Sequence, residues 1–502
     1  MNACLPTLRG AMDFRPTWLA SVALLVLAGC AQGPNFETPA APNTPTSAQG
    51  LTQYTEAKQL TSTVAVPGLQ GESQQLVPAD SANHLKTQWW TLFESPALDE
   101  LLQQALAHNP NLEATRANLK QAEESYTALY GSLALPNVGL SLQGGRERTS
   151  YLQTEYPSVD TNLYNASVNV SYTVDLFGAN KRNLEAQLAS VDYQRFQLEA
   201  AKLALTANVV TTAIREASLR DQLQTTRELL RLQTEQLQVL EQQYQIGGVG
   251  LNPVLSQRAL VANTRAQLPP LEKALAQARH QLAVYVGQLP SEAGLPQLDL
   301  AQLRLPQKIP LTMGSDLVRQ RPDIRASEAL WHQASAQVGV ATANLYPQIN
   351  LTASLGATAL TPAELLVGKW GFWNLMGGLT QPIFNGGALS AKKRGAEAAF
   401  EAAGEQYRGT VLQAFQNVAD SLTALSHDAQ ALQAQVEAES AAQQLLDLSQ
   451  AQYQVGGLSY LNLLDAQRNY QQARIAVVSA RATRLADTAA LFQSLGGGWW
   501  QP

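Results

Sequence analysis

The chain is poor in the residue types that build disulfides, metal sites and catalytic centres. Its 502 residues include two cysteines, four methionines and five histidines. The histidines are scattered without the spacing of metal ligands, and so few methionines give no support to a soft-metal relay. Neither a phosphate-binding loop nor a nucleophile elbow occurs in the sequence. We therefore expect no enzymatic activity, no metal, and no cofactor apart from a covalent lipid.

Positive charge is also sparse. Lysine and arginine together number 34 against 40 aspartates and glutamates, which gives a net charge of −6. No cluster of basic residues interleaved with aromatic residues occurs, so we expect no binding of nucleic acid.

The N-terminus carries one short apolar run. Arg9 and Arg15 precede it, and it extends from Trp18 to Leu27. A run of about ten residues is too short to span a bilayer and has the length of a signal-peptide core. It ends Leu27-Ala28-Gly29-Cys30, which resembles a bacterial lipobox. We predict a signal peptide over 1–29 and lipid on Cys30, the alternative being an ordinary signal peptide with a chance cysteine.

The segment after Cys30 indicates where the protein resides. The other cysteine, Cys4, lies in the segment to be removed, so the mature chain has no disulfide. Ala31 follows Cys30, and by resemblance to sorted lipoproteins the absence of aspartate there favours the outer membrane. Residues 30–82 are rich in Pro, Thr, Ser, Gln and Ala, which predicts a lipid anchor with an extended tether.

The rest of the chain is a duplication. The sequence segment at 243–248 recurs almost unchanged at 452–457. Each copy contains a glycine pair that can end a helix and reverse the chain. Further matches pair Asn109-Pro110 with Arg321-Pro322 and Gln257-Arg258 with Gln467-Arg468. We predict two halves, 83–300 and 301–502, each ordered helix, strand pair, long helix, glycine turn, helix.

Apolar residues recur every seven positions before each glycine pair. One register contains Leu184, Val191, Leu198 and Leu205. A second register starts at Val209 and is interrupted by Glu216. After the second strand pair the same spacing returns from Val411 to Tyr453. This period predicts coiled-coil packing. Each long helix of about 65 residues would extend roughly 100 Å. In the first half, Pro269-Pro270 should kink or break the helix after the turn.

Four segments have the alternation of membrane strands. They lie near 137–176 in the first half and near 348–384 in the second, and Trp370, Phe372 and Trp373 are candidates for an aromatic girdle. Four strands cannot close a barrel, and open edges cannot face lipid. Strands in the membrane therefore require an oligomer, whereas a soluble sandwich is the alternative.

Together these features resemble the TolC-like outer-membrane efflux proteins, in the lipidated branch that serves tripartite drug-efflux pumps. The markers are the segment 33–36, Trp89-Trp90, both glycine turns, the segment 463–468 and the closing 496–499. The resemblance implies a mainly α-helical fold with a transmembrane β portion, in which a homotrimer forms a 12-stranded barrel joined to a periplasmic α-helical tunnel. It also implies as partners a periplasmic adaptor, an inner-membrane efflux pump and outer-membrane lipid.

The resemblance further assigns roles to two groups of residues. The adaptor-docking tips are Gly247, Gly248, Val249, Gly250, Leu251, Gly456, Gly457, Leu458 and Ser459. The periplasmic gate is Asp465 and Arg468, with Asn462 and Tyr453 as secondary members. The repeat places Leu255 opposite Asp465, so only the second half has an acid there, and Arg468 at i+3 can pair with it. An ordinary solvated ion pair is the alternative.

The functional prediction is the exit duct that exports small molecules such as drugs to the exterior. A duct for type I protein secretion and a passive porin-like channel are the alternatives. A porin would not need helical hairpins of roughly 100 Å. Because secretion members of the family commonly lack the lipid cysteine, Cys30 favours small-molecule efflux.

Overall fold

The computed structural model describes residues 31–42, 45, 52–55, 60–66, 73–79, 85–149, 159–292, 294–311, 314–367 and 371–500. The predicted signal peptide 1–29, Cys30 and Trp370 lie outside the described residues. The contacts divide the chain into two units, one containing 122–191 and 330–404 and the other containing 38–121, 192–329 and 405–502.

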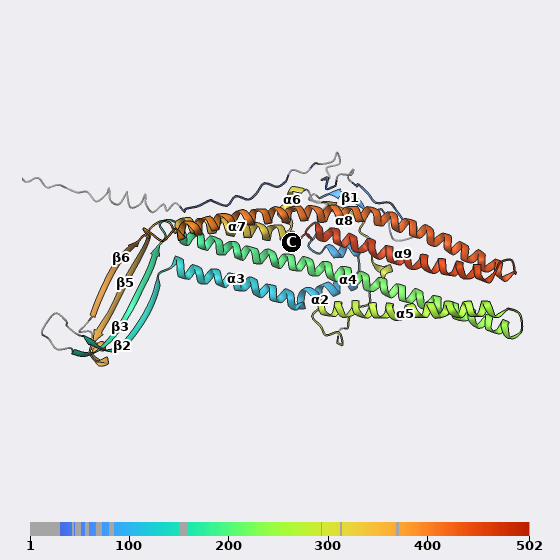
Figure 1. Cartoon of the computed structure of the whole chain (residues 1–502), viewed down its shortest axis with the longest axis horizontal. Coiled ribbons are helices and arrows are strands. Elements are labelled where there is room, and N and C mark those ends of the chain that lie inside the picture. Colours follow the sequence, from blue (N-terminus) through green and yellow to red (C-terminus); the bar gives the residue numbers. More distant parts are fainter. Residues whose placement is uncertain are drawn as a thin grey trace, which may run out of the picture. The chain divides into compact units, whose positions relative to one another are not determined.

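The first unit contains a four-stranded antiparallel sheet in the order β2-β3-β5-β6 (Figure 1). The strands are β2 (Asn137–Thr149), β3 (Val159–Val174), β5 (Gln348–Ala359) and β6 (Gly371–Thr380). Among the residues that the structure describes, β2 and β6 each have one neighbour, so the sheet has two open edges, as the sequence predicted. β6 ends before Gln381-Pro382, where proline removes a ladder donor.

Two long helices and their shorter partners form the hairpins of the fold. α4 (Ala179–Gln245) and α8 (Ala388–Gln454) each contain 67 residues, hence about 100 Å at 1.5 Å per residue. In the described ranges the remaining helices are α2 (Pro96–His108), α3 (Pro110–Ala134), α5 (Leu251–Tyr285), α6 (Gly314–Gln320), α7 (Pro322–Ala343) and α9 (Tyr460–Ser494), with short 3-10 segments η1 (Trp89–Phe93), η2 (Leu300–Gln302) and η3 (Pro362–Val367). A parallel pair, β1 (Gln75–Pro78) with β4 (Lys308–Leu311), completes the second unit.

The seven-residue spacing predicts which helix positions are buried. Val411, Val418 and Leu425 on α8 are all buried, and so is Val209 on α4. Glu216, which interrupts the spacing, is 1% exposed. Its Oε1 accepts hydrogen bonds from Arg220 and, at 3.1 Å, from Arg279. These two guanidinium groups neutralise the buried carboxylate and let it occupy a core position.

Of the kink or break predicted at Pro269-Pro270, the break does not occur. α5 continues from Leu251 to Tyr285 with both prolines inside it. The two missing N–H groups leave the carbonyls of Arg265 and Ala266 without their helical donors. Because both residues are exposed, water can hydrate these carbonyls, and the helix continues.

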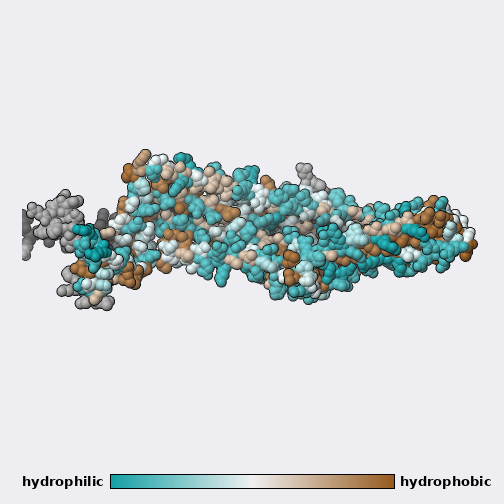
Figure 2. Space-filling view, turned by 60° about the horizontal axis from the view of Figure 1, so that its bottom comes forward, coloured by the Kyte–Doolittle hydropathy of each residue, from teal (hydrophilic) through white to brown (hydrophobic). Residues whose placement is uncertain are grey.

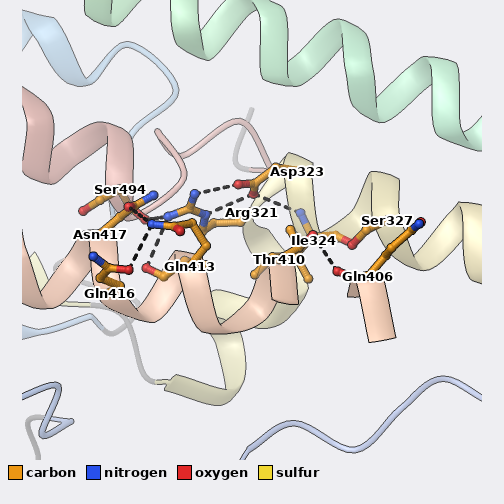
Figure 3. Close-up of polar contacts among 11 residues, drawn as sticks. Arg321, Asp323, Ile324, Ser327, Gln406, Thr410, Gln413, Gln416, Asn417 and Ser494 are labelled. Carbon is orange, nitrogen blue, oxygen red and sulfur yellow. Dashed lines mark hydrogen bonds and ion pairs between the residues drawn. The ribbon is translucent and has the colours of Figure 1, made fainter. Parts of the chain in front are cut away.

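The duplication is also visible in the contacts that join the last residues of one helix to the first residues of another. The end of α5 contacts the start of α3, and the end of α9 contacts the start of α7. Asn109 caps α3 through the Leu112 N–H at 3.1 Å, and its amide donates to the Tyr285 carbonyl at the end of α5 at 2.9 Å. In the second half Arg321 takes this place and donates to the carbonyl of Ser494, the last residue of α9, at 2.9 Å (Figure 3). Asp323 holds the other side of the Arg321 guanidinium, with Nη2 to Oδ2 at 2.6 Å. Each joint thus ties the end of one helix to the start of another.

Asp428 on α8 makes stability depend on pH. Burial raises its pKa to about 7, and Asp487 on α9 adds to the rise by hydrogen bonding and repulsion, against the attraction of Arg484. The folded state therefore holds a proton that the unfolded state has lost, so stability falls as pH rises from about 4 to about 7. We expect Asp428→Asn to raise the melting temperature at the upper end of this window and much less at the lower end. Equal shifts at both ends would contradict a titrating Asp428.

Within the described part of the chain, no helix is both long enough and apolar enough to cross a membrane.

Candidate functional site

Both glycine turns have the same backbone structure. Gly247 has φ +77° and Gly456 has φ +76°, the left-handed region that the sequence predicted. At the end of α4 the Gly248 N–H donates to the Gln243 carbonyl at 2.7 Å and the Gly247 N–H to Tyr244 at 3.0 Å. Gly457 and Gly456 repeat both bonds at the end of α8, at 2.9 and 3.0 Å. This hydrogen-bond pair is the Schellman motif, so each turn is a defined structure that depends on glycine.

Apolar side chains are exposed beside both turns. Ile246, directly before the first turn, is 85% exposed, and Val455, directly before the second turn, is 83% exposed. Leu251 and Leu461 are exposed on the helices that follow. Figure 2 shows this hydrophobic surface at the end of the hairpins. Exposed apolar groups gathered at one place favour a contact with another protein.

The two hairpins pack on each other just behind the turns. Leu240 and Val254 of the first hairpin share a buried cluster with Tyr460, Leu463 and Leu464 of the second. The Tyr460 hydroxyl donates to Gln257, whose amide in turn donates to the Gln233 carbonyl at 2.7 Å. Burial raises the pKa of the Tyr460 phenol, with a smaller contribution from Tyr453. The phenol therefore stays protonated and keeps this bond.

The structure brings Asp465 and Arg468 together on the surface of α9. Arg468 Nη1 lies 3.8 Å from Asp465 Oδ1, and the two side chains are 54% and 69% exposed respectively. The two secondary members make other contacts. The Tyr453 ring lies 5.4 Å from the Tyr460 ring. The Asn462 N–H donates to Ser459, the residue that caps α9, at 3.4 Å. Within one chain, the ion pair between Asp465 and Arg468 is therefore long and exposed to solvent.

The repeat counterpart of Arg468 pairs differently. Arg258 on α5 donates to Glu241 on α4, with Nη2 to Oε1 at 2.7 Å. The position that matches Glu241 in the second half holds Gln450. The first hairpin therefore fixes its arginine between two helices, whereas the second leaves its arginine with an acid on the same helix.

A groove lined by polar side chains together with Leu260 and Ile475 lies between α5 and α9 next to this pair. Its volume is about 390 Å³, and its lining includes Arg468, Asn263, Gln267 and Gln472. Gln471 Nε2 donates across the groove to Gln267 Oε1 at 3.4 Å. Sequence reasoning missed both this bond and the Gln257–Tyr460 bond, because single long-range amide contacts leave no period in a sequence.

The sheet presents one apolar and one polar face. Leu140 pairs with Val168, which pairs with Leu355, which pairs with Trp373. The next row holds Gly139, Asn169, Ser354 and Asn374. In the rows that cross all four strands, the polar face carries hydroxyl and amide groups, two glycines, Phe372 and Met376, and no ionised side chain. This alternation across four strands is typical of a pore wall with lipid on its other face.

Residues next to the predicted lipid site are fixed to the first unit. The buried Arg182 on α4 donates to the carbonyls of Gln32 and Gly33 at 3.2 and 3.4 Å and to the side chain of Asn35 at 2.7 Å. Phe36 stacks on His332, with ring centroids 4.6 Å apart. The N-terminal segment is therefore held by the protein as well as by any lipid on Cys30.

No group of three or more His, Cys, Asp or Glu side chains that could hold a metal occurs in the described ranges.

Comparisons with known proteins agree with these features. The family model described as "Outer membrane efflux protein" matches residues 101–288 and 314–497. The toluene efflux pump outer membrane protein TtgC of Pseudomonas putida is 29% identical over 490 residues, which cover 96% of this chain and 95% of that protein. The probable outer membrane lipoprotein SilC of Salmonella typhimurium is 26% identical over 494 residues, covering 97% of this chain and 99% of that protein.

A solved structure shows the same fold. The outer-membrane channel OprN superposes with a TM-score of 0.83 at 26% sequence identity, covering 94% of this chain and 100% of that chain. The predicted fold, helical hairpins joined to a strand portion, is therefore confirmed.

Proposed function

Because the chain belongs to the outer membrane efflux protein family, we propose that it is the exit duct of a tripartite pump that exports small molecules. The outer-membrane location and the efflux role predicted from the sequence are confirmed by the family and by relatives such as TtgC and SilC. This is a family of outer-membrane channel proteins, and no catalytic step is proposed. One observation carries the proposal: a sheet with two open edges and two faces continues into helices of 67 residues.

The open edges support an oligomer, and we propose the homotrimer that the resemblance to the family implies. Unpaired N–H and C=O groups at β2 and β6 cannot face lipid, so each edge needs a strand from another copy. Three chains with four strands each give twelve, which exceeds the minimum of about eight for a closed barrel. The hydroxyl and amide face then lines the pore.

The ends of the hairpins support partners in the periplasm. We propose that the turns at Gly247–Leu251 and Gly456–Ser459 dock on a periplasmic adaptor that an inner-membrane pump feeds. Asp465 and Arg468, with Asn462 and Tyr453, form the gate behind these turns. The exposed Ile246 and Val455 supply apolar contact area, while the Schellman turns present it in a fixed conformation.

A gene deletion discriminates between efflux and the alternatives. We expect cells that lack this chain to accumulate an efflux substrate such as ethidium, and the restored gene to reverse the accumulation. The matched control strain carries the gene for this chain and lacks the gene for the adaptor. It should accumulate as much dye as the strain that lacks this chain. A porin would still conduct in that control. Loss of one secreted protein with unchanged dye levels would instead indicate type I secretion.

The lipid on Cys30 is proposed as a second anchor beside the sheet. We expect Cys30→Ser to abolish acylation and to leave assembled trimer at reduced yield, because Arg182 still holds residues 32–35. Mass spectrometry of the purified N-terminus and a trimer assay measure the two effects. An unmodified N-terminal cysteine in the native protein would remove the lipid from this proposal.

A further inference from the structure

The apolar face of the sheet has a sharp outer limit. On β3 this face holds Val174, Tyr172, Val170, Val168, Ala166 and Tyr164 in alternate positions. The eleven residues from Val174 to Tyr164 extend about 33 Å along the strand, hence about 25 Å along the membrane normal at a tilt of about 40°. That height equals the apolar band of an outer-membrane barrel. The Tyr164 ring covers Gly144 on β2 and marks the limit, as interfacial tyrosines do.

Beyond this limit the same face becomes charged. Arg146 and Arg148 on β2 share the parity of Leu140 and Leu142, and they pair across to Asn162 and Asp160. They lie about 5 and 10 Å beyond Gly144 along the normal. The headgroup layer of a bilayer is about 5–8 Å deep on each side. β2 follows α3 and β3 leads into α4, so this end of the hairpin lies away from the helices, on the exterior side.

The two arginines are exposed and held in place. Their side chains are 73% and 71% exposed. Arg146 Nη2 lies 3.2 Å from Asp160 Oδ2, and Arg148 Nε lies 3.7 Å from Asp160 Oδ1. One carboxylate thus positions two guanidinium groups. Glu147 points to the opposite face by strand parity. A guanidinium presents donors in a planar fork, so it can keep a carboxylate on one edge and bind phosphate on another.

We propose that Arg146 and Arg148 form a binding site for the phosphate groups of lipopolysaccharide, the phosphorylated lipid of the outer leaflet. The site fastens the outer rim of the barrel to the leaflet around it. This inference rests on the proposed barrel, because only there does the apolar face meet lipid. The lipid source is favoured over a free anion because the arginines continue the lipid-facing surface directly above its apolar band.

The test is binding of lipopolysaccharide to the purified full-length protein in detergent. We expect Arg146→Gln/Arg148→Gln to weaken binding about tenfold. Asp160→Asn should strengthen binding, because it removes a negative charge that repels phosphate while its side-chain oxygen can still accept hydrogen bonds from the arginines. Arg231→Gln is the matched control, since Arg231 is an exposed arginine on α4 paired with Glu235 at 2.7 Å. The control should bind as the parent does, and dephosphorylated lipopolysaccharide should bind the parent as weakly as the intact lipid binds the double variant.

Four outcomes would overturn the proposal. They are unchanged binding by the double variant, an equal loss in Arg231→Gln, weaker binding by Asp160→Asn, and full displacement of the lipid by inorganic phosphate, which would indicate a free-anion site. Dye efflux by cells carrying the double variant separates this inference from the duct. Retained efflux together with unchanged lipid binding would reject the lipid site alone, whereas failure of the parent itself to restore efflux would reject the duct.

Discussion

Gly456→Glu is expected to abolish efflux while leaving the amount of assembled trimer unchanged. Gly456 has φ +76°, and a side chain there costs about 1–2 kcal/mol in the left-handed region. No atom lies within 4 Å of an added Cβ, so the cost is borne by the turn and not by the core. The Schellman turn should distort and displace the exposed Val455. Dye efflux and adaptor cross-linking measure the loss, and the same change at Gly247 should act in the same direction.

Two control variants separate the turn from the charge. Asparagine tolerates the left-handed region better than other side chains, so Gly456→Asn should retain most efflux. Gly250→Glu is the control for Gly247→Glu, because it places the same charge on the tip of the first hairpin at φ −79°, where no turn depends on glycine. Unchanged adaptor cross-linking in Gly456→Glu would count against docking through these turns. Equal loss in Gly250→Glu would assign the effect to charge.

Asp465→Ala is expected to raise the single-channel conductance of the purified trimer in planar bilayers. Three acids around one axis repel each other unless cations compensate them, and Arg468 lies 3.8 Å away. Exposed pairs contribute about 0–1 kcal/mol each. A ring of three therefore shifts the closed-to-open ratio by at most about a hundredfold. Arg468→Ala should act likewise, and the double variant should add less than the sum, because both changes remove one interaction.

The first hairpin supplies the matched control. Arg258→Ala removes the arginine at the repeat position, whose partner Glu241 lies on α4, and it should leave conductance near that of the parent. High salt should reproduce part of the Asp465→Ala effect, because screening acts over about 8–10 Å near physiological ionic strength. Parental conductance in both single variants would mean that the constriction is held elsewhere.

The periodic parts of the fold could be predicted from the sequence. Burial of Val411, Val418 and Leu425 follows the seven-residue spacing, and the strand alternation gives both faces of the sheet. Gly247 and Gly456 were recognisable because few other residues adopt their backbone conformation. These features are local, so one sequence suffices to find them.

The contacts that could not be predicted join distant segments through single polar groups. Tyr460 meets Gln257, and Arg321 meets Ser494, although neither pair has a spacing or composition that signals it. The β1–β4 pair likewise joins the N-terminal segment to the link between the halves. At Pro269-Pro270 the helix continues although two N–H donors are missing, and the residues with the affected carbonyls are exposed to water. Tertiary context and hydration decided these cases.

Cysteine cross-linking between the two edge strands tests the shared barrel most directly. Ser141→Cys on β2 can be combined in turn with Asn374→Cys, Met376→Cys or Gly378→Cys on β6, all on the polar face. With the proposed lipid on Cys30 and the predicted removal of Cys4, the mature chain has no competing thiol. We predict that oxidation in intact outer membranes gives, for at least one pair, a covalent ladder that stops at three chains. A ladder that continues beyond three, or monomer alone for every pair, would contradict a closed trimeric channel.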